Sequence, residues 1–371
     1  MEKSALEIYK SIDAAIVDFE NSQISINKKY GDRPSGRLME ERNSMVTAAK
    51  DSLKEHLQQL KIADAYCKSI RVHQPLLSNL TEDFINTKSE IPDNIALGLY
   101  SFKSKYFYRK ENGNDVDEIV IPHLYPFPIL KPMYVDDEKT QAHFFQKILL
   151  RLMFTLPMDR QEYYIYDPVG LGDIVMNFNI LLKNEKLFPQ KKVLTTQADL
   201  KDALKKVKEY INSLNESAFN AAENIVDWSS YNRHVLNDSN DENKKKLLPY
   251  KVFVFADISS EMDQECFDMI KVIINQSAKC GLLVLFSYNA EMLHSEDRVY
   301  SRRRLEVQRI VDDSVALHKM IDEQEEIKGF RNIEVKPVGE SFPSSKKLGE
   351  CLRALDTVVA EHSKSMFAFD E

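Results

Sequence analysis

The sequence predicts an α/β fold in which a parallel β-sheet is flanked by helices. Two continuous apolar runs, at residues 252–256 and 282–286, are typical of strands that are buried on both faces of a sheet. A helical pattern at residues 267–278 separates these runs, and such alternation of strand and helix indicates a parallel sheet covered on both sides. The first 70 residues lack this alternation and predict a separate helical arm.

The arm is predicted as two long helices. Apolar side chains recur at three- and four-residue steps, which places them on one helix face, as for Ile8, Ile12 and Ile16. A break rich in Gly and Pro at residues 31–36 precedes a second helical stretch at 37–70. Two antiparallel helices form a helical hairpin or coiled-coil arm, which we expect either to dock a partner or to pack on the chain's own core.

A small β-hairpin region follows the arm. Residues 97–102 and 105–108 are rich in aromatic side chains, as strands are. Residues 111–115 (Glu-Asn-Gly-Asn-Asp) predict a tight hairpin turn, after which 118–121 returns as a strand. A short helix is expected at 81–86, before these strands.

From residue 129 onward, strands and helices alternate. Strands are expected at 163–166, 192–194, 252–256 and 282–286, and helices at 141–154, 197–214 and 267–278. Ligands of parallel sheets bind at the carboxyl ends of the strands, where Asp167, Asp257 and Ser287 fall. We therefore divide the chain into a helical arm, a β-hairpin connector, the α/β domain, and a C-terminal helix or tail, at residues 1–90, 91–128, 129–340 and 341–371.

Composition narrows the class of protein. The chain of 371 residues is 43% hydrophobic, enough for a substantial core, and its formal charge of −8 argues against a surface coated with phosphate contacts. No apolar run approaches the roughly 20 residues of a transmembrane helix, and no signal-peptide core follows the start. The four cysteines are widely spaced and show no CxxC pattern, so we expect them to be reduced, buried thiols and not disulfides or zinc ligands. We expect a cytoplasmic protein without membrane contact.

Five short motifs resemble those of FtsK/SpoIIIE-type ATPase domains, in the same order. One is similar to the Asp-Pro-Lys-Gly segment after a core strand, and closer still to a segment of multi-module FtsK-like proteins: Asp167-Pro168-Val169-Gly170-Leu171-Gly172. The others are Val193-Leu194-Thr195-Thr196, Tyr231-Asn232, Leu248-Pro249-Tyr250 with the strand that ends at Asp257, and Cys280-Gly281 with the strand after it. The resemblance covers residues 119–290 and implies a RecA-like, P-loop-type sheet.

The resemblance also indicates where a nucleotide would bind. A P-loop needs glycines for close backbone approach to the phosphates, then Lys and Ser or Thr. Lys139 and Thr140 stand at about the right place, but no glycine precedes them. Asp136, Asp137 and Glu138 stand there instead and would repel a tetra-anionic nucleotide.

The Walker B and sensor positions are altered as well. By resemblance, Asp257 is the metal-side carboxylate, but Ile258 occupies the position of the water-activating Glu. The family's Thr-Gln sensor corresponds to Ser287 and Tyr288. Lys139, Thr140 and Asp257 are therefore interpreted as vestigial nucleotide-binding residues, with no catalytic residue retained. We expect no cofactor; if the chain binds one, the resemblance implies ATP with Mg²⁺.

Two further groups leave alternatives open. Asp167 and Asp257 could form a carboxylate pair for Mg²⁺, or could cap loops at the strand ends. Trp228 and Tyr231, near Arg233, could stack on a base, or could pack beneath a loop.

The favoured hypothesis is a catalytically degenerate FtsK/SpoIIIE-like module that serves as a structural or regulatory part of a DNA-translocase-like assembly. Its expected partner is a protein with an active ATPase module, in a homo- or hetero-oligomer. DNA contact would use local basic runs at 103–110, 244–246 and 302–304. One alternative is a divergent active DNA-dependent ATPase that uses Lys139, Thr140 and Asp257. Another is a DNA-binding clamp without hydrolysis.

Overall fold

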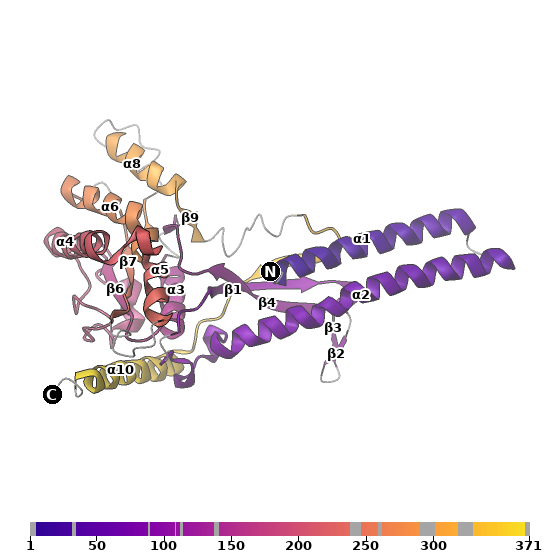
Figure 1. Ribbon diagram of the computed structural model, residues 1–371, viewed down its shortest axis with the longest axis horizontal. Coiled ribbons are helices and arrows are strands. Elements are labelled where there is room, and N and C mark those ends of the chain that lie inside the picture. Colours follow the sequence, from indigo (N-terminus) through magenta and orange to yellow (C-terminus); the bar gives the residue numbers. More distant parts are fainter. Residues whose placement is uncertain are drawn as a thin grey trace. The chain divides into compact units, whose positions relative to one another are not determined.

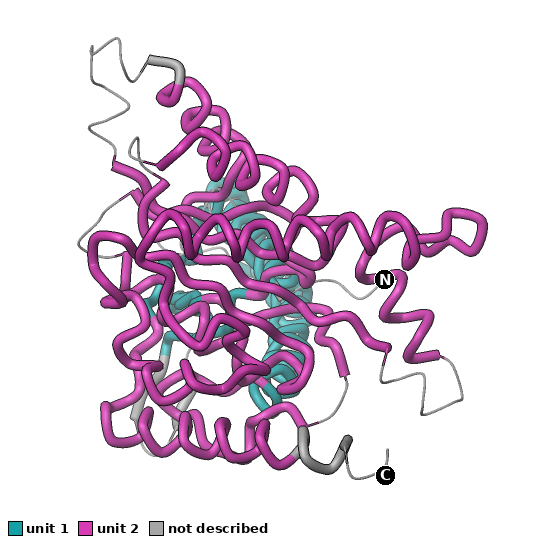
Figure 2. Tube along the Cα trace, turned by 90° about the vertical axis from the view of Figure 1, so that its left-hand side faces the viewer, with its two compact units in different colours: residues 1–73, 98–123, 321–339 teal, residues 74–97, 124–320, 340–371 magenta. Residues whose placement is uncertain are grey.

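The computed structural model of the chain describes residues 5–31, 35–87, 90–107, 109–111, 114–136, 141–237, 246–258, 262–289, 301–317 and 329–367. The chain divides into two compact units, coloured separately in Figure 2. Unit 1 comprises Met1–His73, Gly98–His123 and Ile321–Gly339, and unit 2 comprises Gln74–Leu97, Leu124–Met320 and Glu340–Glu371. These units are discontinuous in sequence, and the domain boundaries expected at residues 90, 128 and 340 stay a prediction.

Unit 1 contains the predicted helical arm. Its helices α1 (Ala5–Tyr30) and α2 (Arg37–His73) lie antiparallel (Figure 1). Near the end of α1 and the start of α2, the Tyr30 hydroxyl donates to Met45 Sδ at 3.5 Å, and Arg42 Nη2 donates to Asn27 Oδ1 at 3.2 Å. The helical hairpin is confirmed, whereas a coiled-coil packing stays a prediction.

Unit 1 also contains antiparallel strands, two of which extend into unit 2 at residues 94–97 and 124–126. A three-stranded sheet has the order β10 (Glu334–Val338), β1 (Asn94–Lys103), β4 (Glu118–Pro126). Strand β2 (Arg109–Glu111) pairs with β3 (Asn114–Val116), so a hairpin forms in the predicted region but from other residues than the expected strands at 105–108 and 118–121. The strand expected at 105–108 is wrong, since Lys105–Phe107 forms a short 3₁₀ helix.

The core of unit 1 joins the arm to these strands. The ring of Tyr9 stacks on that of Phe102 with centroids 4.1 Å apart. The buried carboxylate of Asp13 accepts backbone N–H groups of Arg331, Asn332 and Ile333, at 2.8–2.9 Å. Polar and aromatic contacts thus hold residues 331–333, far away in sequence, against α1.

Unit 2 is built on a five-stranded parallel sheet. Its strands are β5 (Met133–Val135), β6 (Gln161–Tyr166), β7 (Tyr250–Phe255), β8 (Leu282–Ser287) and β9 (Val315–Ala316), in the spatial order β6-β7-β8-β5-β9. The first strand in sequence therefore lies between the fourth and the fifth, as in a RecA-like P-loop sheet. This order confirms the predicted fold class.

Helices cover both faces of the sheet. They are α3 (Gln141–Thr155), α4 (Gln197–Ser213), α5 (Trp228–Asn237), α6 (Gln264–Cys280), α8 (Ser301–Asp312) and α10 (Ser345–Phe367). Alternate side chains of β7 enter two different cores, because successive strand residues point to opposite faces. Val252 and Val254 pack with α3 and α10, whereas Phe253 and Phe255 pack with α4 and α6.

Unit 2 also contains several short helices. The short helices are Leu77–Asn79, Glu82–Phe84, Asp173–Phe178, Leu214–Ala218 and Ala221–Glu223. The strand expected at 192–194 is wrong: a single parallel bridge joins Leu194 to Tyr166. Across the described ranges, no helix has both the length and the apolar character needed to cross a membrane.

Candidate functional site

The carboxyl edge of the parallel sheet gathers the residues that the sequence singled out. Asp136, Asp167 and Asp257 follow the ends of β5, β6 and β7 closely, and Ser287 is the last residue of β8. The predicted placement of Asp167 and Asp257 at this edge is confirmed. Lys139 and Thr140, together with Asp137 and Glu138, lie outside the described residues.

Asp167 turns back onto its own loop. The residue is only 2% exposed, and its two carboxylate oxygens accept the backbone N–H groups of Gly170, at 2.8 Å, and Gly172, at 2.9 Å. A Cβ at residue 170 would lie 2.9 Å from Asp167 Oδ2, and Gly172 has φ +109°. The Asp and both glycines of the motif are thus required by the loop itself, which favours the loop-capping interpretation over a metal ligand.

The residue directly after Asp257 is buried inside the protein. Ile258 is 0% exposed, and its backbone N–H donates to the Ser287 carbonyl at 3.0 Å. The buried Ser287 hydroxyl donates to the carbonyl of Ala256. These contacts join the ends of β7 and β8 and so hold this part of the sheet edge together.

Aromatic and acidic groups meet at the end of β5. The ring of Tyr134 stacks on Phe286 and lies beside Tyr288, each at a centroid distance of 5.7 Å. Burial, and then the charges of Asp136 and Asp312, raise the pKa of Tyr134. The pKa of Tyr288 is raised to about 12, first by burial and then by Tyr134, Asp136 and Asp312. Two negative charges, those of Asp136 and Asp312, therefore act on both tyrosines at the carboxyl edge of the sheet.

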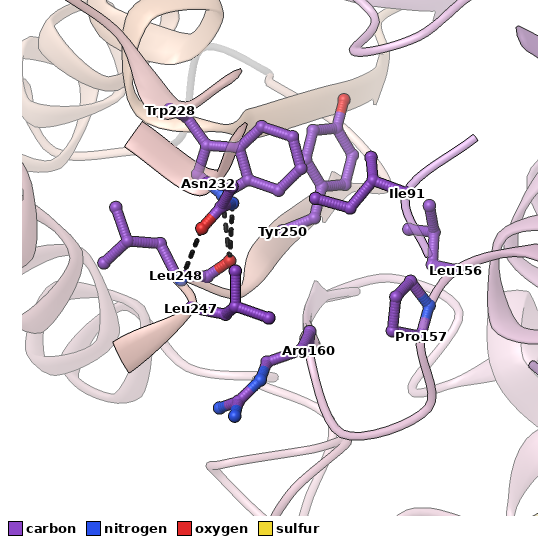
Figure 3. A pocket seen from close by; sticks show the side chains of 9 residues that line it. All are labelled: Ile91, Leu156, Pro157, Arg160, Trp228, Asn232, Leu247, Leu248 and Tyr250. Carbon is purple, nitrogen blue, oxygen red and sulfur yellow. Dashed lines mark hydrogen bonds between the residues drawn. The ribbon is translucent and has the colours of Figure 1, made fainter. Parts of the chain in front are cut away.

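Two of the remaining motifs meet at the opposite, amino edge of the sheet, and Figure 3 shows their residues Asn232, Leu248 and Tyr250 beside Trp228. The indole Nε1 of Trp228 donates to the carbonyls of Leu248 and Pro249, at 3.0 and 3.2 Å. Asn232 accepts the Leu248 N–H at 2.8 Å and donates to its carbonyl at 3.2 Å. Trp228 is buried and packs beneath this segment, so base stacking on its ring is excluded as the structure stands.

The pocket that these residues line is small. Its cavity volume is about 10 Å³, which is room for roughly one water molecule. The apolar side chains of Ile91, Leu156 and Tyr250 form much of its wall. The Tyr-Asn and Leu-Pro-Tyr segments therefore pack together in this corner of unit 2.

Several side chains in the basic runs are engaged within the protein. Arg303 lies 4.1 Å from the centroid of the Phe267 ring and donates to the Met262 carbonyl at 3.1 Å. Lys105 pairs with Glu20 at 2.7 Å. All four cysteines are buried and unbridged, and the described part of the chain contains no group of three or more His, Cys, Asp or Glu that could hold a metal ion.

Comparison with known proteins gives remote structural similarity. No protein-family model matches the sequence, and no curated protein matches it. A structure of EssC (ATPases 2 and 3) from Geobacillus thermodenitrificans gives a TM-score of 0.46 at 10% identity, over 78% of this chain and 52% of that chain. EccC (ATPases 2 and 3) from Thermomonospora curvata, in complex with a signal sequence peptide, gives 0.42 at 10% identity, over 72% and 47%.

The conjugation coupling protein TcpA of pCW3, in its monomer form with ATPγS, gives a TM-score of 0.34 at 10% identity, over 78% of this chain and 86% of that chain. The present chain spans about half the length of the EssC and EccC structures.

Proposed function

We propose that this chain is a catalytically degenerate FtsK/SpoIIIE-like ATPase module that acts as a structural or regulatory part of a DNA-translocase-like assembly. The observation that carries the proposal is the burial of Ile258 at the position of the water-activating glutamate, with its backbone tied to Ser287. An apolar side chain cannot orient or deprotonate a water molecule. The internal use of the Ser287 hydroxyl and the negative charge near Tyr134 support the same conclusion.

Steady-state hydrolysis tests this function. The full chain is incubated with Mg-ATP, with and without DNA, beside Ile258→Glu and Asp257→Ala. We expect no turnover above background in any of them, because Ile258→Glu restores one group but not a phosphate-binding loop. Turnover by the wild-type chain that Asp257→Ala abolishes would contradict the proposal.

The proposed partner is a protein that carries an active ATPase module. The loop after β6 supports a protein contact, because Val169 and Leu171 are 80% and 72% exposed although the loop is held rigidly by Asp167. Leu171 also has φ +49°, a left-handed conformation that costs a non-glycine residue about 1 kcal/mol. The loop thus holds two large apolar side chains in solvent, and these are the proposed contact with the partner.

Site-specific crosslinking in the source cells tests the partner. A photoreactive residue replaces Leu171, and a matched control replaces Val226, another exposed apolar residue of unit 2. We expect position 171 alone to capture a protein whose sequence contains an intact GxxxxGK[ST] loop. Capture of no such protein, or equal capture from position 226, would contradict a partner bound through this loop.

One observation favours the alternative of a divergent active ATPase. Lys139 and Thr140 stand directly before α3, which begins at Gln141, in the strand–loop–helix order that a P-loop requires. Asp257 would then serve the metal, and the hydrolysis assay above separates this function from the degenerate one. A DNA-binding clamp receives less support, because Arg303 and Lys105 are engaged within the protein.

A further inference from the structure

Unit 1 holds a short segment of chain against α1 and the edge of β1. This segment, which we call the strap, consists of residues 330–338 and ends in strand β10. The strand lies at the edge of its sheet and pairs antiparallel with residues 99–103 of β1. The strap, α1 and this part of β1 all belong to unit 1, so their contacts lie within one compact unit.

A buried carboxylate receives the start of the strap. Asp13 of α1 is 5% exposed. Its Oδ2 accepts the N–H of Arg331 at 2.9 Å, and its Oδ1 accepts those of Asn332, at 2.8 Å, and Ile333, at 2.9 Å. Successive backbone N–H groups that converge on one anion make strong, charge-assisted bonds. Asp13 therefore recognises the main chain of the strap and fixes its register, whatever its side chains are.

Apolar side chains of the strap add selectivity. Ile333 is 3% exposed, and the ring of Phe330 meets that of Phe102 nearly at right angles, with centroids 5.7 Å apart. Val335, two residues after Ile333 and so on the same side of the strand, packs against the same core. The segment that fits this place thus has the pattern Phe-x-x-Ile-x-Val.

The place that the strap occupies is formed by parts of the chain that are remote from it in sequence. Asp13 lies on α1, and Phe102 and the pairing edge lie on β1. The groups that they bind are contained in one continuous segment. An extended segment that adds to an open sheet edge is a recurrent mode of recognition, in which the main chain gives affinity and alternate side chains give specificity. The same segment of another copy makes the same contacts, as in domain swapping.

We propose that Asp13 and the edge of β1 form a docking site for an extended segment, which the chain's own strap occupies and which the strap of a second copy takes in an assembly. A second copy is the occupant because its strap carries the side-chain pattern and the backbone donors that the site accepts. The site lies in unit 1 and does not depend on whether the carboxyl edge of the parallel sheet in unit 2 binds nucleotide.

A free strap peptide tests the docking site. The probe is a fluorescent peptide of residues 329–339, and its binding to the full chain is followed by anisotropy. The wild-type chain should bind it poorly, since a tethered segment competes at a millimolar effective concentration. Ile333→Asp weakens the chain's own strap but leaves Asp13 and β1 intact, and should bind the peptide at least about tenfold more tightly.

Substitutions on α1 are the controls for this gain. Asp13→Ala, added to Ile333→Asp, should remove the gain because the peptide loses its acceptor. Asp18→Asn, at an exposed carboxylate of the same helix, should preserve it. Peptide binding that is equal in the wild-type and Ile333→Asp chains, or that survives the loss of Asp13, would overturn the docking site.

Mixing two damaged chains tests the second copy as the occupant. Ile333→Asp supplies an open site, and Asp13→Ala supplies an intact strap that has lost its own acceptor. Tagged Ile333→Asp should copurify with untagged Asp13→Ala, whereas tagged Asp13→Ala should not, because only the first pair combines an intact site with an intact strap. Peptide binding without association of the first pair would overturn the second copy as the occupant.

The helical circular dichroism signal reports whether each variant folds. If Ile333→Asp does not fold, Arg331→Pro takes its place in both assays. This substitution removes one of the three N–H donors at an exposed residue and leaves the buried side chains of the strap unchanged. The expected gain in peptide binding and the expected pairing are the same, and their absence overturns the proposal in the same way.

Discussion

The indole ring of Trp228 lies directly against the backbone of Gly281, so closely that a Cβ at residue 281 would be 2.3 Å from the ring atoms Cγ and Cδ1. Gly281 has φ +66° and ends α6, where its N–H bonds to the Ser277 carbonyl. Trp228 cannot retreat without losing its hydrogen bonds to Leu248 and Pro249. A glycine is therefore required at this position by both conformation and space.

Gly281→Ala is expected to lower the free energy of unfolding by about 3 kcal/mol, because overpacking and a left-handed alanine add together. Urea denaturation of the full chain measures the change. Gly349→Ala is the matched control: it lies inside α10 with only the Arg353 guanidinium nearby, at 3.8 Å, and should raise stability by up to about 1 kcal/mol. Similar effects of the two substitutions would contradict the packing described here.

Asp167→Ala is expected to cost about 3 kcal/mol of unfolding free energy, since two backbone N–H groups lose a charged acceptor. Asp167→Asn keeps one carbonyl acceptor and should cost roughly half as much. Denaturation curves of the two variants test this order. A loss below about 0.5 kcal/mol in Asp167→Ala would show that the carboxylate is not a loop cap, since surface changes have effects of that size.

Tyr288 is expected to ionise only at strongly alkaline pH. Its pKa is raised to about 12 by burial, and further by Tyr134, Asp136 and Asp312. Because the folded pKa exceeds the ordinary value of about 10, this residue's contribution to stability is fully present below pH ~10 and is lost as the pH rises toward 12. Difference absorbance titration against Tyr288→Phe measures the value.

Asp312→Asn supplies the check on that assignment. Removing one neighbouring negative charge should lower the pKa of Tyr288, and the difference titration should shift toward neutral pH. An unchanged titration curve would mean that the Asp312 carboxylate does not act on this ring.

The sheet was predictable where its strands are continuous apolar runs. Every residue of β7 and β8 is buried, and the unbroken apolar runs in their sequences predict this burial. β5 was not predicted, because a strand of three residues is defined by its pairing of Met133 with Leu285 and not by a local pattern. The 192–194 segment has strand-like residues, but only Leu194 reaches a neighbour. The pairing of Leu99 with Val338 could not be predicted from local periodicity either, because the two residues lie far apart in the sequence.

The candidate site was predictable in position but not in geometry. Chain order places Asp167 and Asp257 at one sheet edge, because both follow parallel strands. The Asp167 side chain accepts hydrogen bonds from the backbone of Gly170 and Gly172. The spacing of Asp and Gly in the sequence was a signal for this loop, since Asp side chains often bond the backbone a few residues on. The contact between Trp228 and Gly281 offers no such signal, since the two residues belong to different elements and meet only through the fold.

Calorimetric titration and thermal unfolding of the full chain with Mg-ATP test the central claim most directly. A ligand that binds only the folded state adds about 2.7 kcal/mol at a hundredfold excess over its dissociation constant, so a functional site would be easily seen. The account predicts no binding heat and an unchanged melting temperature at millimolar Mg-ATP. A rise in melting temperature that is lost in both Lys139→Ala and Asp257→Ala would contradict it.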